Sequence, residues 1–407
     1  MRIALVHNEY GKVSGEEVAV NHLAALLEEK GHHVIRFSRG SAEIRQKALG
    51  QLQACLAGVY NPFSRRAFAR MLDSTGPEIV HVHNLYPFIS ASILPECTKR
   101  NVPVVMTLHN FRIVCPNALL MRDGRVCHEC LGGREWRCAW HNCEHSLPKS
   151  VGYAARTAFA RRSGWFRAHV SRFICLTAFQ RDIYAREGFP AERMAVIPNP
   201  GGLIRDSRFE IRDEDDSRFE IRDSNYVGYV GRVSPEKDVP TLLAAARLLP
   251  DIPFKVAGDF WRMRDLVRQA PVNVKFLGHL DAPRLSEFYR DMRLMAFTTL
   301  CYEGFPMALV EAMAKGIPIV CARIGGLPEI VEDGHTGLLY EPGNADQLAG
   351  CIKQLWDDQK LSERLGEAGR QKARTQYSDE SIYKQLMNVY DGIHKHPMHF
   401  LDADSRG

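Results

Sequence analysis

Short apolar strands alternate with longer amphipathic stretches along this chain, and this alternation constrains its fold more than any other feature. The pattern runs through most of the 407 residues and starts afresh near residue 226. The expected strands cover residues 3–7, 33–37, 79–83, 102–109, 172–176, 226–230, 254–257, 274–277, 294–298 and 317–322. Alternation of this kind predicts an α/β protein built on doubly wound parallel sheets, with helices on both faces of each sheet.

The length favours two domains, because 407 residues exceed what one hydrophobic core usually organises. The first domain is expected over residues 1–200 and the second over 225–380, followed by a last helix and tail at 381–407. Ligands of open α/β sheets bind beyond the carboxyl ends of the strands. The site is therefore predicted in a cleft where two such domains face each other.

A charged linker is expected at residues 201–224, between the two series of strands. Within it, the eight residues 206–213 recur at 216–223. Two copies of so short a unit cannot build a repeat architecture, and charged linkers extend and tolerate insertions. We interpret the repeat as linker or hairpin without a catalytic role.

Composition and charge exclude several classes of protein. Hydrophobic residues make up 45% of the chain, as in globular proteins, and no run of about 20 apolar residues predicts a transmembrane helix. The N-terminal sequence enters a strand without the long apolar region of a secretory signal, which favours the cytoplasm. A net charge of +5 does not argue for nucleic acid as a partner.

The stretch from Glu303 to Ala314 is the most informative in the chain. Glu303 precedes a Gly-Phe-Pro turn, and Glu311 follows eight positions later in an apolar run with helical character. Because residues before a proline avoid helical dihedrals, we expect a helix to begin near Pro306. Free backbone N–H groups at such a start favour an anion. Taken alone, either carboxylate could equally lie on a solvated surface.

A basic loop follows the first strand of the second domain. Gly231 would let the backbone approach a ligand closely, Arg232 can fork onto phosphate oxygens, and Lys237 supplies a compact positive charge. Basic residues on such loops often simply face solvent. His109 and His279 each stand at a strand end, where a structural role is the alternative to ligand contact.

The Glu303-x7-Glu311 pair and the run Gly231-Arg232-x3-Glu236-Lys237 resemble the signatures of family 4 glycosyltransferases. That resemblance implies a GT-B fold with two Rossmann-like domains and transfer of a sugar from a nucleotide-diphospho-sugar, a UDP- or GDP-sugar, with retention. Asp238 stands where the family has a glycine, and Asn110 follows His109 where the family usually has an aspartate. The Ser14-Gly15 pair keeps one glycine of the family's Gly-Gly loop.

The resemblance also implies roles for individual residues. Arg232 and Lys237 would hold the donor diphosphate, Glu303 the sugar, Glu311 the ribose, and His109 would contact the sugar from the first domain. The implied catalytic set is His109, Arg232, Lys237 and Glu303, and the implied donor-binding set is Gly15, Gly231, Arg232, Lys237, His279, Gly304, Phe305, Pro306, Met307 and Glu311. Two fixed cations at the diphosphate would substitute for a metal, so no catalytic cofactor is expected.

The implied function is glycosyl transfer to a glycan acceptor in polysaccharide or cell-envelope glycoconjugate synthesis. The implied fold also places the last helix back against the first domain. Two other functions remain open: a nucleotide-sugar epimerase of the same fold, and a nucleotide-sugar-binding protein without catalysis. A nicotinamide-dependent oxidoreductase is disfavoured because no strand is followed by Gly-x-Gly-x-x-Gly.

A cysteine-rich segment at 115–146 departs from the family pattern. Cys127, Cys130, Cys138 and Cys143 follow Cys115 with spacings typical of a structural zinc site, which would order a polar segment. A redox or disulfide pair, free thiols and, less favoured, an iron–sulfur centre are the alternatives.

Arginines and aromatic residues interleave between residues 156 and 172. The segment contains Arg156, Phe159, Arg161, Arg162, Trp165, Phe166, Arg167 and Arg172. Such a pattern suits an anionic membrane surface, and with it a lipid-linked acceptor and peripheral attachment to the membrane. A core helix with a basic outer face is the alternative.

Overall fold

The computed structural model describes residues 1–9, 14–40, 50–201, 226–261 and 263–395, and the chain divides into two compact units. Unit 1 comprises residues 1–120, 127–200 and 382–407, and unit 2 comprises 121–126 and 201–381. The tandem repeat at 206–223 lies outside the described residues.

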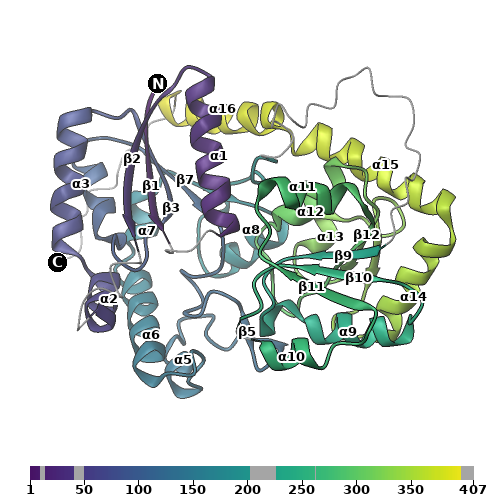
Figure 1. Cartoon of the computed structure of the whole chain (residues 1–407). Coiled ribbons are helices and arrows are strands. Elements are labelled where there is room, and N and C mark those ends of the chain that lie inside the picture. The colour runs from purple at the N-terminus through teal and green to yellow at the C-terminus, as the bar shows by residue number, and fades with distance from the viewer. Residues whose placement is uncertain (10–13, 41–49, 202–225, 262, 396–407) are drawn as a thin grey trace. The chain divides into compact units, whose positions relative to one another are not determined.

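Unit 1 is built on a six-stranded sheet in the order β2-β1-β3-β4-β7-β8, with every pair parallel (Figure 1). Its strands are β1 Arg2–Glu9, β2 His33–Gly40, β3 Ile79–Asn84, β4 Val104–Leu108, β7 Arg172–Cys175 and β8 Met194–Val196. The chain runs from β1 outward to β2 and then returns to the other side of β1. The strand order therefore reverses between β1 and β3, where such sheets usually bind ligands at the carboxyl ends.

Helices flank this sheet. They are α1 Gly15–Glu29, α2 Gly50–Val59, α3 Pro62–Thr75, α4 Leu94–Thr98, α5 Trp136–Trp140, α6 Leu147–Arg162, α7 Trp165–His169, α8 Ala178–Arg186 and, from Ile382 onward, α16 Asp379–Lys395. Local sequence sets their ends: at α1, Ser14 and Glu17 form a reciprocal capping box, and Gly31 with φ of 83° follows the helix.

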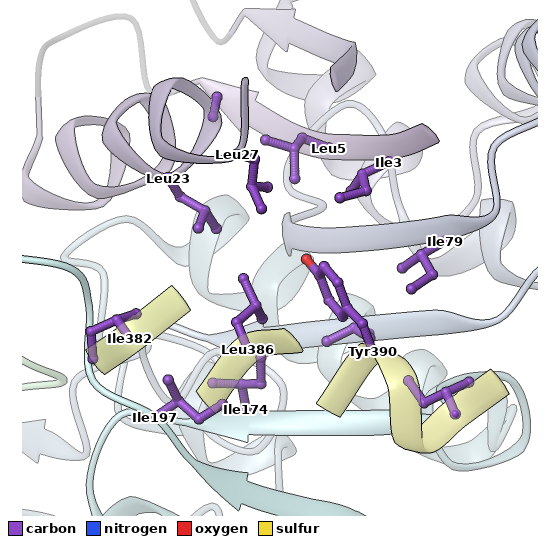
Figure 2. Packing of buried hydrophobic residues seen from close by; sticks show 13 residues of the cluster. Ile3, Leu5, Leu23, Leu27, Ile79, Ile174, Ile197, Ile382, Leu386 and Tyr390 are labelled. Atoms are coloured by element: carbon purple, nitrogen blue, oxygen red, sulfur yellow. The ribbon is translucent and has the colours of Figure 1, made fainter. Parts of the chain in front are cut away.

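The apolar face of α16 completes the core of unit 1. Ile382, Leu386, Tyr390 and Ile393 recur at helical spacing and are buried against the sheet and α1. Figure 2 shows Leu386 and Tyr390 reaching from α16 among side chains of the strands, including Ile79 and Ile174. The last helix is therefore part of the core of unit 1.

Unit 2 has a second all-parallel sheet, in the order β11-β10-β9-β12-β13-β14. Its strands are β9 Tyr226–Val230, β10 Phe254–Ala257, β11 Val274–Gly278, β12 Met292–Phe297, β13 Ile319–Ala322 and β14 Leu338–Tyr340. Its helices are α9 Val239–Leu248, α10 Arg264–Arg268, α11 Ala282–Arg290, α12 Met307–Ala314, α13 Leu327–Ile330, α14 Ala345–Asp357 and α15 Gln359–Gln376. Here the strand order reverses between β9 and β12.

The α/β prediction with two doubly wound parallel sheets is confirmed, and each predicted strand is present within a few residues. Two edge strands were missed: β8 and β14 have three residues each, too few for a sequence pattern to show. The sequence also gave no sign of the two-residue hairpin strands β5 Met121–Arg122 and β6 Arg125–Val126. Among the described residues, no helix is long and apolar enough to cross a membrane.

Replacement of Leu386 by alanine tests the contribution of α16 to unit 1. The side chain is 2% exposed, so truncation leaves a cavity and lowers the free energy of unfolding by about 2–5 kcal/mol. Urea unfolding followed by circular dichroism measures the change. Asn388→Ala, at an exposed position of the same helix, is the matched control and leaves the transition in place. An unchanged midpoint for Leu386→Ala would contradict this packing.

Candidate functional site

The carboxyl ends of β9 and β12 bring Lys237 and Glu303 together in unit 2. Lys237 ends the short helical turn η6 Pro235–Lys237 after β9, and Glu303 lies in the loop between β12 and α12. The Nζ of Lys237 donates to Oε1 of Glu303 over 2.6 Å, with side chains only 17% and 13% exposed. The pair therefore stands where the strand order of this sheet reverses.

Lys237 keeps its charge because of this pairing. Burial is the largest single effect and lowers the pKa of Lys237, but Glu303, Cys301 and Glu236 together raise it by more, so the pKa lies above its ordinary value. The Glu303 carboxylate also accepts a hydrogen bond from Oγ1 of Thr299 over 2.9 Å. The site thus holds a fixed cation in a partly desolvated position, where its field is strong.

Hydrogen bonds tie the two site loops to each other. Thr298 Oγ1 donates to the carbonyl of Lys237 over 2.7 Å, and Thr299 Oγ1 lies 3.1 Å from the carbonyl oxygen of Glu236. The backbone N–H of Leu300 also donates to the Glu236 carbonyl, over 2.9 Å. These contacts hold the loop after β9 against the loop after β12, so the ion pair rests on a rigid frame.

Glycines let the backbone come close at the end of β9. A Cβ atom on Gly258, where φ is 148°, would lie 1.8 Å from the carbonyl oxygen of Gly231. Gly231 itself has φ of 157° and bonds through its N–H to the Ala257 carbonyl. A side chain at Gly258 would force the two loops apart, and a Cβ atom at Gly231 would lie 3.0 Å from the Tyr229 hydroxyl oxygen.

Asp238 takes the left-handed conformation that a glycine adopts more easily, with φ of 50° and ψ of 40°. Its Oδ1 accepts a hydrogen bond from Thr241 Oγ1 over 2.8 Å, inside the first turn of α9. Short polar side chains tolerate this conformation because they bond locally. The turn therefore keeps its shape although the family glycine is replaced.

The remaining donor-binding candidates of unit 2 lie along the same sheet edge. Arg232 is 72% exposed and bonds to Glu236 over 3.2 Å, so it does not join the Lys237–Glu303 pair. His279 is exposed directly after β11. Gly304, Phe305 and Pro306 lead into α12, whose first residue is Met307, so the predicted helix start is confirmed.

Glu311 lies one turn inside α12. Its Oε2 accepts a hydrogen bond from the buried Tyr289 hydroxyl over 2.7 Å. Burial raises the pKa of Glu311, and the hydrogen bond from Tyr289 lowers it. The effect of burial is the larger one, so the pKa lies above its ordinary value. A carboxylate held by one donor keeps further oxygen lone pairs for hydroxyl groups of a ligand.

In unit 1, His109 belongs to a group of histidines that the sequence analysis did not identify. His7 lies on β1, His81 and His83 lie on β3, and His109 directly follows β4, at the edge where the strand order reverses. Nδ1 of His83 and Nε2 of His109 are 2.9 Å apart. The His-x-His pattern ending a strand was the sequence signal for His81 and His83.

His81 is anchored on both ring nitrogens. Nδ1 lies 2.7 Å from the Tyr390 hydroxyl of α16, and Nε2 lies 2.8 Å from Oγ1 of Thr107 on β4. Its ring stacks on that of His83 with centroids 4.3 Å apart. The last helix therefore helps to position the histidine group, as well as closing the core.

All four imidazoles are neutral at neutral pH. Burial lowers the pKa of His7 to about 4 and the pKa values of His81 and His109 to about 3. Burial likewise holds the pKa of His83 well below its ordinary value. Neutral rings can donate one hydrogen bond and accept another, so they suit polar, uncharged ligand groups.

A cavity wholly within unit 1 opens beside these histidines. It is lined by Ala19, Leu23, His81, His83, Thr107, His109, Ile174, Leu176, Ile197, Pro198, Asn199, Pro200, Ile382 and Leu386. Gly15 is the first residue of α1 and does not line this cavity, and a Cβ atom there would meet no atom of the described residues within 4 Å. Nothing in the packing around Gly15 requires a glycine.

The cysteine-rich segment packs in unit 1 on α6. Cys130 and Cys138 are buried with Ala154, and Cys143 packs against them. Burial raises the pKa of Cys130 to about 12. No disulfide joins any of the eleven cysteines, and within the described residues no three His, Cys, Asp or Glu side chains are arranged to hold a metal ion. The four predicted ligands Cys127, Cys130, Cys138 and Cys143 are thus not arranged as a metal site in this structure. Structural zinc stays a prediction.

The aromatic side chains between residues 156 and 172 pack inward. Phe166 is buried, and Trp165 meets Phe159 edge to face with centroids 5.5 Å apart. Arg156 is buried between the rings of Tyr86 and Tyr153. This segment forms two helices, α6 and α7, in which Phe166 is buried while Phe159 and Trp165 are half-buried.

Two family models match the chain, one over each series of strands. The model described as Glycosyltransferase Family 4 matches residues 13–200, and the one described as Glycosyl transferases group 1 matches residues 211–372.

Curated relatives match over part of the chain. An uncharacterized glycosyltransferase of Methanocaldococcus jannaschii is 31% identical over 173 residues, which are 42% of this chain and 48% of the relative. The O-antigen chain mannosyltransferase B of Escherichia coli is 30% identical over 176 residues, 40% of this chain and 45% of the relative. The chain spans about half the length of these curated relatives.

Solved structures match over almost the whole chain. HepE of Anabaena, in complex with UDP and glucose, has a TM-score of 0.65 at 20% identity, covering 96% of this chain and all of that one. Sucrose-phosphate synthase from Thermosynechococcus elongatus has a TM-score of 0.67 at 18% identity, covering 97% and 99%. The two parallel-sheet units share the GT-B fold of these solved structures, and each series of strands is similar to a glycosyltransferase family model.

Proposed function

We propose that this protein is a retaining glycosyltransferase that moves a sugar from a UDP- or GDP-sugar to a glycan acceptor. The product would belong to a polysaccharide or a cell-envelope glycoconjugate. One observation carries the proposal: the Lys237–Glu303 pair at the point where the unit 2 sheet reverses its strand order. The complexes of HepE with UDP and with UDP-glucose support a uridine nucleotide as the first donor to test.

Each partner of the pair has a distinct role in this proposal. Lys237, charged and fixed, would stabilise the negative charge that grows on the diphosphate as the anomeric C–O bond breaks. Arg232 is exposed and bonds to Glu236 over 3.2 Å, and its long side chain would swing onto the phosphate oxygens. Glu303 would accept hydrogen bonds from sugar hydroxyls, and Glu311 from the ribose. No metal is needed in this scheme.

The transfer would proceed on one face of the sugar. The anomeric carbon loses its bond to the diphosphate oxygen and gains a bond to the acceptor oxygen on the same side. The acceptor proton passes to the departing phosphate oxygen. Glu303 is engaged by Lys237 and Thr299, which fits a positioning group better than a covalent nucleophile.

A lipid-linked acceptor would require the protein to dock on a membrane. Unit 1 exposes large apolar side chains on α5 and α6, two helices that pack on each other, and we call this the α5–α6 apolar face: Trp136, Trp140, Leu147 and Val151. The helices α2 and α5 both pack on α6 (Figure 1), and Gly152 of α6 lies against Cys55 of α2. Basic side chains at Arg134, Lys149 and Arg162 are exposed on the same elements or beside them.

We propose that this face binds an anionic lipid surface. Trp136 and Trp140 are 57% and 78% exposed, one helical turn apart, on the side of α5 opposite the buried Cys138. Tryptophan is suited to the boundary between headgroups and acyl chains, and nearby cations are attracted to anionic headgroups. This face is a second candidate membrane surface beside the 156–172 segment, in which Phe166 is buried.

Lys237→Ala and Glu303→Gln test the donor site. Loss of one charged contact to the transition state lowers kcat/KM by about 10²–10³-fold, measured as nucleotide released from a panel of nucleotide sugars. Lys275→Ala removes an exposed lysine from β11 outside the site and serves as the matched control, with near-normal turnover. Near-normal rates in either site variant would contradict the assigned roles.

The same donor panel, followed by nucleotide release, donor conversion and melting temperature, separates the three functions. A glycosyltransferase consumes the donor in the presence of an acceptor, an epimerase converts the donor without one, and a binding protein raises its melting temperature with the nucleotide but turns nothing over. Conversion without an acceptor, or binding without turnover across the panel, would overturn transfer as the function.

Trp136→Ser combined with Trp140→Ser tests the α5–α6 apolar face. Removal of both exposed indoles reduces co-sedimentation with anionic liposomes several-fold. Binding to such a membrane depends on the apolar area inserted together with the attraction of nearby basic side chains to anionic lipid. Trp261→Ser removes a tryptophan that is 49% exposed on unit 2 and is the matched control. Co-sedimentation that is equal for all variants, or that does not depend on the content of anionic lipid, would contradict membrane binding by this face.

A further inference from the structure

The hydrogen bond between His83 and His109 restricts which ring nitrogen of His109 can carry its proton. Nδ1 of His83 lies 2.9 Å from Nε2 of His109, so one of the two must donate and the other accept. Both rings are neutral, because burial lowers both pKa values. Each ring therefore has one N–H, and choosing the donor fixes both tautomers at once.

The other nitrogen of His83 favours one choice. His83 is 5% exposed, and its Nε2 is buried without a hydrogen-bond partner among the described residues. If His109 donated, the proton of His83 would lie on Nε2 as a buried N–H without an acceptor. Buried donors without partners are rarer in proteins than buried acceptors without them. The proton of His83 therefore belongs on Nδ1, where it has an acceptor.

The surroundings hold His83 in this orientation. Its ring stacks on His81, and His81 is itself held by the Tyr390 hydroxyl and by Thr107. The centroids of the His83 and His109 rings are 5.2 Å apart. His83 thus has a fixed ring plane, which a positioning residue needs.

We propose that His83 is a positioning residue that donates from Nδ1 to Nε2 of His109, holds His109 in its Nδ1–H tautomer, and makes that N–H a hydrogen-bond donor for a substrate oxygen. His83 acts through His109 and does not itself contact the reacting atoms. The substrate part of this inference rests on the proposed function and on the sugar contact that the family resemblance implies for His109. The tautomer part rests on the geometry alone.

Nitrogen-15 NMR of histidine-labelled full-length protein reads the tautomer directly. The spectrum of wild type at neutral pH is expected to show the proton of His109 on Nδ1, with the signal assigned by its loss in His109→Gln. His83→Phe keeps a ring for stacking but removes the donor, so His109 should shift to a mixture of tautomers. His83→Asn places an amide N–H near the position of Nδ1 and should keep the wild-type tautomer.

Turnover supplies the second measurement. His83→Phe is expected to lower kcat about tenfold with little change in the donor KM, and His83→Asn to recover most of the loss. His33→Phe, at an exposed histidine on β2 of the same unit, controls for general effects of the substitution. A merely structural role for His83 would lower the melting temperature without moving the tautomer.

Two results would overturn the inference. One is a wild-type spectrum with the proton of His109 on Nε2, which needs no variant to fold. The other is a His83→Phe protein whose His109 tautomer is unchanged. If no nucleotide sugar is consumed but His109 is found as Nδ1–H, the proposed function fails and the His83 assignment stands.

Discussion

Parallel pairing of every strand in both six-stranded sheets is the constraint on which the other features depend. In each sheet, parallel pairing places the carboxyl ends of all strands at the same edge. Each connection between strands must then cross a face of the sheet to begin the next strand. Where the strand order reverses, adjacent loops diverge and leave room for a ligand. Lys237 and Glu303 stand at that point in unit 2, and His7 and His83 stand at the corresponding point in unit 1.

The two edges differ in electrostatic character although they share a topology. In unit 2, a carboxylate offsets the desolvation of Lys237 and keeps it cationic. In unit 1, the histidines lie close together. Burial lowers their pKa values and leaves the rings neutral. A fixed cation suits a diphosphate, whereas neutral donors and acceptors suit hydroxyl groups. Local burial and pairing, more than the fold itself, decide which ligand chemistry each edge offers.

Much of the fold followed from the sequence because buried parallel strands are continuous apolar runs bounded by turns. The helix start after Pro306 was predictable because proline restricts its neighbour. The position of Lys237 beside Glu303 was not predictable from spacing, since it depends on a loop contact across 66 residues. Inward packing of Phe166 also escaped prediction, because an aromatic residue among arginines fits a core helix as well as a surface.

The histidine group shows why a single-residue interpretation of a site is incomplete. His109 could be singled out because it follows a strand, but its chemistry depends on which nitrogen carries the proton. That choice is made by His83, 26 residues earlier, and His83 is held by His81, whose ring nitrogen meets Tyr390, 309 residues away. Because α16 supplies this hydroxyl from within the core of unit 1, packing of the last helix and the state of the site are coupled. Loosening of α16 should therefore alter His109 before it unfolds the sheet.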